Sequence, residues 1–135
     1  MIVVDNDVIS YFWLEADRTT TARAVRERDS DWVAPMLWRS EFRNVLYQLM
    51  QYRGLPLSEA SQIADLVEDD MAESTYEVDT NTVLRLIEAT GHSAYDCEYV
   101  ALAQALGVPL VTGDTTVAEE FPGTATLLEA FVDAP

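Results

Sequence analysis

Five short apolar runs, separated by longer segments with helical periodicity, constrain the fold of this chain more than any other feature. The runs are Ile2–Val4, Trp32–Ala34, Tyr76–Val78, Pro109–Thr112 and Ala125–Leu128. Their β-branched and aromatic residues predict short buried strands. Strands that alternate with helices form a parallel sheet covered on both faces. The sequence therefore predicts an α/β fold, a three-layer α/β/α sandwich with a central parallel sheet of about five strands.

The segments between the runs predict seven helices, because apolar side chains recur in them at three- to four-residue spacing. Candidate capping residues include Thr19, Thr20 and Thr21 before the second helix and Asp79 before the fifth, and glycines follow the fifth and sixth. The expected helices are Val8–Leu14, Asp17–Arg28, Met36–Arg53, Ser58–Glu73, Asp79–Gly91, Ser93–Leu106 and Thr115–Phe121.

The length and composition predict one domain over residues 1–135, since there is no repeat, linker or low-complexity tract. No run of apolar residues is long enough to span a bilayer, so we expect a soluble, cytoplasmic protein without a membrane partner. The single cysteine, Cys97, excludes an internal disulfide framework and a zinc site built from several thiolates.

The charge distribution is strongly acidic and uneven. The net charge is −16, and all eight basic residues are arginine. Residues 1–53 carry seven arginines and eight acids, whereas residues 54–135 carry one arginine and sixteen acids. Proteins that bind nucleic acid usually present a basic patch to the phosphates. This composition counts against a nucleic-acid substrate unless metal ions or the arginine-bearing half neutralise the phosphates, and it is typical of proteins from a salty cytoplasm.

Four acids fall where an α/β sheet usually forms its functional site. Asp5 directly follows the first apolar run, and Asp114 follows the fourth after one glycine. Glu41 lies in the first turns of the helix after the second run, and Asp96 lies in the first turn of the helix before the fourth. Sites in open parallel sheets form beyond the carboxyl ends of the strands. We expect Asp5, Asp114 and Glu41 at this edge, and Asp96 also if its helix runs in the reverse direction through a split crossover.

Carboxylates gathered at one point repel each other unless a cation lies among them. An oxygen-only set without imidazole or thiolate ligands favours Mg²⁺ or Mn²⁺. Such an ion can activate water and stabilise in-line displacement at phosphorus. Each acid also has a structural interpretation when taken alone: Asp96 as a charge at a helix N-terminus, and Asp114 as a turn residue.

Three segments resemble one protein family. IVVDNDV, SEFRNVL and YDCEYVALAQALGVPLVTGD, with their spacing, are similar to PIN domains, in particular to the VapC toxin ribonucleases of toxin–antitoxin pairs. The resemblance extends from Ile2 to about Leu128. It implies a sheet of about five parallel strands, Mg²⁺- or Mn²⁺-dependent endonucleolytic cleavage of RNA, homodimerisation and inhibition by a small VapB-like antitoxin. By position, the catalytic and metal-binding acids of the family correspond to Asp5, Glu41, Asp96 and Asp114.

The resemblance also assigns supporting residues. Thr112 matches the polar residue beside the metal, and Asn44 matches an asparagine one helical turn after Glu41. Asp7 departs from the family, which usually has a small polar residue there, and adds a fifth acid. Thr115 and Thr116 occupy positions where many relatives have a basic residue that could contact phosphate.

Other polar residues near these acids have two interpretations. Arg39 and Arg43 are candidates for phosphate contacts or for pairing with Glu41, and surface salt bridges are the alternative. His92, the only histidine, could act as a general base, but a structural role in its loop is favoured. Glu98 is two residues from Asp96 and is expected to face solvent.

Two other functions compete with a nuclease. VVDNDV also resembles the nucleophile motif of haloacid-dehalogenase-like phosphatases, but those enzymes hold the phosphoryl group with a lysine, which this chain lacks. A catalytically weak PIN-like scaffold that acts by protein–protein binding is the second alternative, suggested by the acidic surface. A P-loop nucleotide hydrolase is excluded because the chain has no GxxxxGK segment.

Overall fold

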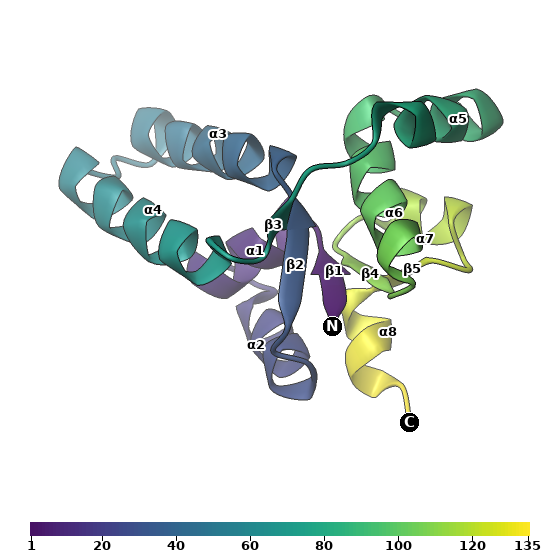
Figure 1. Cartoon of the computed structure of the whole chain (residues 1–135). Coiled ribbons are helices and arrows are strands. Elements are labelled where there is room, and N and C mark those ends of the chain that lie inside the picture. The colour runs from purple at the N-terminus through teal and green to yellow at the C-terminus, as the bar shows by residue number, and fades with distance from the viewer.

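The structure, a computed structural model, describes all residues, 1–135, and contains one five-stranded sheet with the order β3-β2-β1-β4-β5 (Figure 1). Every neighbouring pair of strands is parallel. The predicted α/β sandwich with a parallel five-stranded sheet is therefore confirmed. The strands are β1 (Ile2–Val4), β2 (Trp32–Pro35), β3 (Thr75–Tyr76), β4 (Leu110–Thr112) and β5 (Ala125–Leu127).

The strand order reverses at β1. The chain proceeds from β1 outward through β2 to β3, then crosses back to pair β4 with the other side of β1. The register pairs Val3 with both Val33 of β2 and Leu110 of β4. Two crossovers therefore leave the carboxyl ends of β1 and β4 in opposite directions, which opens a crevice between them, the usual place for a site in this class of fold.

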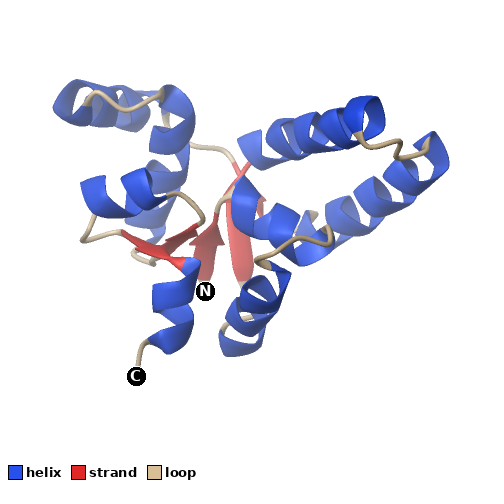
Figure 2. Ribbon diagram, turned by 180° about the vertical axis from the view of Figure 1, so that it is seen from behind, coloured by secondary structure: helices blue, strands red, loops and turns tan.

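Eight helices surround the sheet (Figure 2). One face is covered by α6, against which α5 packs; α1 packs on the other face, where it contacts α2, which in turn contacts α8. The antiparallel pair α3 and α4 projects beyond the β2–β3 side of the sheet (Figure 1). The helices are α1 (Asn6–Trp13), α2 (Thr19–Arg28), α3 (Leu37–Tyr52), α4 (Leu57–Met71), α5 (Thr80–Thr90), α6 (Ala94–Leu106), α7 (Thr115–Glu120) and α8 (Leu128–Asp133).

Side-chain caps begin four of these helices. Asp5, Asp79, Ser93 and Asp114 each accept a hydrogen bond from a backbone N–H in the first turn of the helix that follows. The predicted threonine cap of α2 is wrong. The Thr19 hydroxyl accepts from the N–H of Ala16 and approaches the carbonyls of Tyr11 (2.7 Å) and Leu14 (3.1 Å) as a donor, so it fixes the loop between α1 and α2.

Most boundaries differ from the expected ones by one or two residues, and two differences concern whole elements. The third strand is Thr75–Tyr76 instead of Tyr76–Val78, because its only partner, β2, ends at Pro35. The chain after the fifth strand forms α8, which the sequence pattern did not predict. Leu128 was expected to end a strand but is a fully buried residue of this helix. Six residues give too short a pattern to separate helix from strand by periodicity.

One main hydrophobic core of 25 buried residues joins the sheet to both helix layers. Val3 and Val4 of β1 and Leu110 and Val111 of β4 are fully buried within it. Such runs, apolar at successive positions, are expected in strands covered on both faces. None of the helices combines the length and the apolar character required to cross a membrane.

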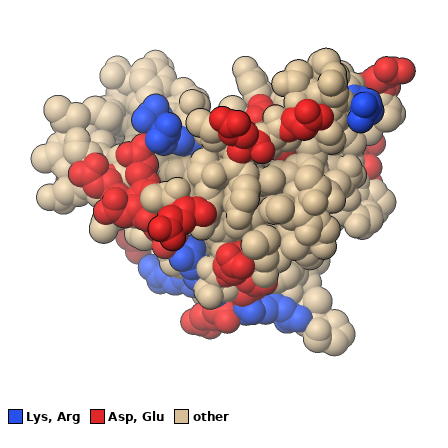
Figure 3. All heavy atoms as spheres, viewed as in Figure 1, with Lys and Arg blue, Asp and Glu red and all other residues tan.

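Arginines of the N-terminal half lie beside acids of the C-terminal half. Figure 3 shows acidic side chains spread over one face of the molecule, with arginines among them. Arg26 of α2 makes a two-bond ion pair with Asp70 of α4, at 2.8 and 3.1 Å. Its guanidinium also lies over the rings of Trp32 (4.8 Å) and Phe12 (5.4 Å). This side chain therefore connects α2, α4 and β2.

Replacing Arg26 with alanine is expected to lower the free energy of unfolding by about 1–2 kcal/mol, because the ion pair and both ring contacts are lost together. Urea denaturation followed by tryptophan fluorescence measures the change. Arg23, exposed on the same helix and free of ion pairs, provides the control. R23A is expected to shift stability by less than about 0.5 kcal/mol, and equal losses in the two variants would contradict the role given to Arg26.

Candidate active site

Asp5 and Asp114 lie at the carboxyl ends of the two strands between which the strand order reverses. Asp5 follows β1 and caps α1, whereas Asp114 follows β4 and caps α7. Both acids therefore have helix N-termini behind them, where backbone N–H groups stabilise negative charge. This placement is the one expected from their positions directly after apolar runs.

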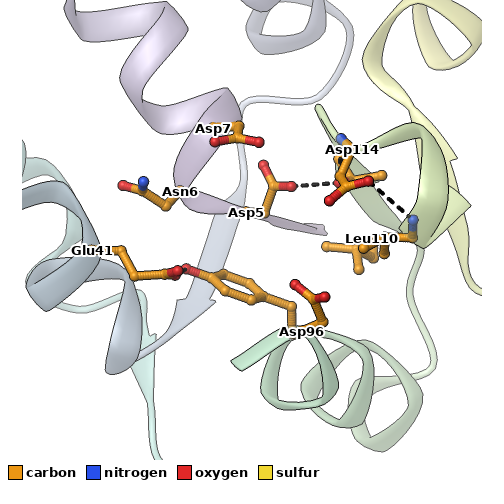
Figure 4. A pocket seen from close by; sticks show the side chains of 10 residues that line it. Asp5, Asn6, Asp7, Glu41, Asp96, Leu110 and Asp114 are labelled. Carbon is orange, nitrogen blue, oxygen red and sulfur yellow. Dashed lines mark hydrogen bonds between the residues drawn. The ribbon is translucent and has the colours of Figure 1, made fainter. Parts of the chain in front are cut away.

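Five carboxylates line one cavity of about 70 Å³ at this edge of the sheet. They come from five positions far apart in the fold: the end of β1, the first turn of α1, the first turns of α3, the first turn of α6 and the end of β4. Figure 4 shows them around a common space. The acids are Asp5, Asp7, Glu41, Asp96 and Asp114.

Asp96 lies at this edge as well, without the split crossover that the sequence analysis gave as the condition for it. Its helix, α6, leads directly into β4. A helix that precedes a parallel strand must run from the carboxyl edge of the sheet back to the amino edge. Its first turn, which contains Asp96, therefore lies at the carboxyl edge in an ordinary crossover.

Thr112 connects the two strand-end acids. Its buried hydroxyl donates a hydrogen bond to Oδ2 of Asp5 and accepts one from the N–H of Asp114 (3.0 Å). Asp5 also accepts from the N–H groups of Val8 (3.0 Å) and Gly113 (3.2 Å). The orientation of Asp5 is thus fixed on both carboxylate oxygens, while Asp114 is held by N–H groups of α7 through one oxygen, Oδ1.

Glu41 is oriented by a residue that the sequence interpretation missed. The buried hydroxyl of Tyr99 donates to Oε1 of Glu41 at 2.6 Å. Burial, followed by the charge of Glu41, raises the pKa of Tyr99 well above its usual range, so this hydroxyl keeps its proton. The signal was available: Tyr99 lies three residues after Asp96 and therefore on the same face of α6.

Three of the acids hold their protons more tightly than usual. Removal from water and the charge of Asp7 raise the pKa of Asp5 to about 7. Burial also raises the pKa of Asp7, with contributions from Asp114 and Asp96 and an opposing one from Arg18. Burial and the charges of Asp7 and Asp96 raise the pKa of Glu41 against the hydrogen bond from Tyr99. Negative charge accumulates here without enough compensation.

The donor set fits a hard divalent cation by its chemistry. Carboxylate oxygens dominate the lining, and no basic side chain, histidine or cysteine belongs to it. As the side chains stand, no three acidic groups are close enough together to hold one ion. The carboxylates of Asp7 and Asp96 accept no hydrogen bond in the structure, so both can rotate toward a cation.

Arg18 binds the backbone next to the cavity, a role that the sequence interpretation did not predict. Its Nη1 donates to the carbonyl of Gly113 (2.9 Å) and to the hydroxyl of Tyr11 (3.3 Å), and its other nitrogens bind Glu129 of α8. Gly113 has no room for a side chain, because an added Cβ would come within 2.9 Å of the Cβ of Asp7. Arg18 therefore fixes the backbone that separates Thr112 from Asp114.

The arginines proposed as partners of Glu41 lie elsewhere. Arg39 and Arg43 both approach Glu68 of α4, with N–O distances of 3.8 and 3.4 Å. Pairing with Glu41, one of the roles left open by the sequence, is not seen, because these two residues lie on the side of α3 that faces α4. Both form surface salt bridges, and phosphate contact stays a prediction.

Three further polar residues lie outside the acidic cavity. Asn44 lines a separate pocket that shares Glu41 with it. His92 packs its ring against Phe121, 5.1 Å between centroids, and stands 4.0 Å from Asp96, in keeping with a structural role. Glu98 was expected to face solvent, but it is partly buried, and this burial raises its pKa.

Solved structures that share this fold include the following three. PAE2754 from Pyrobaculum aerophilum is 20% identical with a TM-score of 0.76, covering 97% of this chain and 92% of that one. FitAcB from Neisseria gonorrhoeae is 15% identical with a TM-score of 0.74, at 96% and 99% coverage. FitAB bound to an IR36 DNA fragment is 17% identical with a TM-score of 0.73, at 95% and 95% coverage. At these identities the likeness concerns the fold.

A search of curated proteins found no similar sequence. The PIN domain family model, in contrast, matches residues 2–120, a span that includes all five acids of the cavity and both strands that carry Asp5 and Asp114. Because this match covers most of the sequence, the chain belongs to the PIN domain family.

Proposed function

We propose that this protein is a Mg²⁺- or Mn²⁺-dependent endoribonuclease. PIN domains are generally nucleases. The observation that carries the proposal is the cavity between β1 and β4, where five carboxylates from five parts of the fold meet with no basic residue in the lining. Such a concentration of negative charge is costly in a folded protein unless a cation compensates it.

The acids of the cavity and two hydroxyl donors have different parts in this proposal. Asp5, Glu41, Asp96 and Asp114 hold the cation, and Asp7 adds to the negative field. Thr112 and Tyr99 each donate a hydrogen bond that orients one carboxylate. When bound, the divalent ion lowers the pKa of a water molecule and stabilises charge at the phosphorus under attack. The acids position that ion and the water beside the phosphodiester.

We further propose that the protein is the toxin of a toxin–antitoxin pair, forms a homodimer and is inhibited by a small VapB-like antitoxin. The resemblance to VapC ribonucleases supports this assignment. The projecting pair α3–α4 also exposes large apolar side chains that a partner could bury: Tyr47 (51% exposed), Leu66 (57%) and Leu57 (70%). A structure of FitAB bound to DNA is among those with the same fold.

Metal dependence is tested directly by RNA cleavage. Purified protein is expected to cleave RNA with Mg²⁺ or Mn²⁺, to lose activity in EDTA and to regain it when the ion is restored. D5N and D96N are each expected to reduce the rate at least about 100-fold, because each removes charge from the proposed cation site. Product formation on gels measures the rates.

A matched aspartate outside the cavity controls for general effects of charge. Asp65 is exposed on α4, and D65N is expected to retain the wild-type rate. Cleavage that persists in EDTA, or equal rates for D5N and D65N, would reject the metal mechanism. Complete inactivity with intact partner binding would favour the scaffold alternative.

The metal-free protein is expected to lose stability as pH rises from about 4 to 7. The folded state binds the proton of Asp5 more tightly than the unfolded chain does, since the folded pKa is about 7 instead of 3.8. Protonated Asp5 contributes at most a few kcal/mol to the free energy of unfolding. This contribution is complete at pH values below the unfolded pKa and disappears as the pH rises through the folded pKa. Urea denaturation in EDTA at several pH values measures this trend.

Two comparisons separate this effect from the general acidity of the chain. D5N is expected to flatten the pH dependence between about pH 4 and 7, and D65N is expected to preserve it. Added Mg²⁺ should stabilise the wild-type protein more at about pH 8 than at about pH 5, because the ion competes with protons for the same oxygens. Identical curves for wild type and D5N would contradict the buried charge assigned to Asp5.

A further inference from the structure

A second pocket adjoins the acidic cavity on the far side of Glu41. Its volume is about 410 Å³, and it shares Asn6 and Glu41 with the cavity. Glu41 therefore stands in the wall between the two spaces. A ligand group in the second pocket would be directly next to a group bound among the carboxylates.

The lining of this pocket differs from that of the cavity. Leu37 and Val45 of α3 supply apolar surface, and Ser40 and Asn44, from the same helix, supply a hydroxyl and an amide. Glu41 is its only charged residue. This lining suits a flat, uncharged group with hydrogen-bond donors and acceptors along its edge. Amides and hydroxyls can donate hydrogen bonds to such a group and accept hydrogen bonds from it.

Tyr95 gives this pocket an aromatic wall. It precedes Asp96 in the first turn of α6, and 62% of its surface is exposed, although the residue is large and partly apolar. The ring of Tyr95 is not part of the hydrophobic core, and its hydroxyl makes no hydrogen bond in the structure. Exposed aromatic rings beside phosphodiester sites stack nucleobases, a contact that tolerates any base.

The charges around the site favour base contacts over phosphate contacts. Arg18 is engaged by Glu129, and Arg39 and Arg43 both approach Glu68. No arginine lines the cavity or the second pocket. A strand that brings its phosphate to the carboxylates therefore gains little from ion pairs and must be held by its bases.

We propose that the pocket formed by Asn6, Leu37, Ser40, Asn44, Val45 and Tyr95 binds one unpaired nucleobase next to the scissile phosphate, with Tyr95 as its stacking surface. The proposal rests on the nuclease function proposed above and adds to it a subsite for one base. A base within a duplex is stacked and paired, so it cannot enter the pocket without leaving the helix.

Steady-state cleavage of oligoadenylate tests the role of Tyr95. Y95A is expected to raise KM by about tenfold with little change in kcat, because stacking holds substrate and transition state equally. Y95F and Y95W keep a ring and are expected to retain the wild-type KM within about twofold. Tyr52, 74% exposed at the other end of α3, is the control, and Y52A should leave KM unchanged.

An abasic substitution scanned along the same oligonucleotide identifies the contacted base. At one position next to the cleaved bond, removal of the base is expected to raise the KM of the wild type by the same factor as the Y95A substitution does. The same abasic substrate is expected to raise the KM of Y95A no further. An unchanged KM in Y95A, or an abasic penalty that persists in full in Y95A, overturns the base pocket and leaves the nuclease proposal standing.

Binding without cleavage separates failure of the pocket from failure of the enzyme. If wild type cleaves no RNA with either metal, the proposed function fails, and fluorescence then decides on the pocket. Quenching of Y95W by oligoadenylate, beyond that of the wild-type tryptophans, supports base stacking. Emission that oligoadenylate leaves unchanged overturns it.

Discussion

Mutual repulsion among carboxylates at the reversal point of the sheet is the constraint on which the rest of the site depends. The backbone brings Asp5 and Asp114 together because β1 and β4 are neighbours. The shared hydroxyl of Thr112 and the N–H groups at the starts of α1 and α7 offset part of the repulsion. Burial, followed by the charge of Asp7, raises the pKa of Asp5 to about 7, so the folded protein bears a cost for ionising this acid. A bound cation would offset that cost.

No arginine lines the acidic cavity, and Arg18 and Arg26 form ion pairs elsewhere in the fold. Arg26 joins α2 to α4 through Asp70, and Arg18 joins α2 to α8 through Glu129. These contacts connect the less acidic N-terminal half of the sequence to the strongly acidic remainder. They also explain how a chain of net charge −16 can fold compactly while its central cavity has no basic side chain in its lining.

The sheet and its strand-end acids could be predicted from sequence because both depend on local patterns. Short β-branched runs specify buried strands, and an acid directly after such a run must lie at the carboxyl edge. The spacing to Asp96 places Tyr99 on the same face of α6, but its bond to Glu41, the contacts of Arg18 and helix α8 could not be predicted in the same way. Tyr99 and Arg18 act through contacts to residues 58 and 95 positions distant, Glu41 and Gly113. Such contacts depend on how the crossovers pack, which local periodicity does not encode.

Helix α8 is linked through Arg18 to the backbone beside the acidic cavity. Residues 121–135 lie beyond the span matched by the family model, yet Glu129 holds the guanidinium that binds the carbonyl of Gly113. Shortening the chain before Glu129 would release Arg18, the one cation that lowers the pKa of Asp7, to move toward the carboxylates or away from them. The last helix, though distant in sequence from Asp7, therefore influences the charge environment of that acid through Arg18.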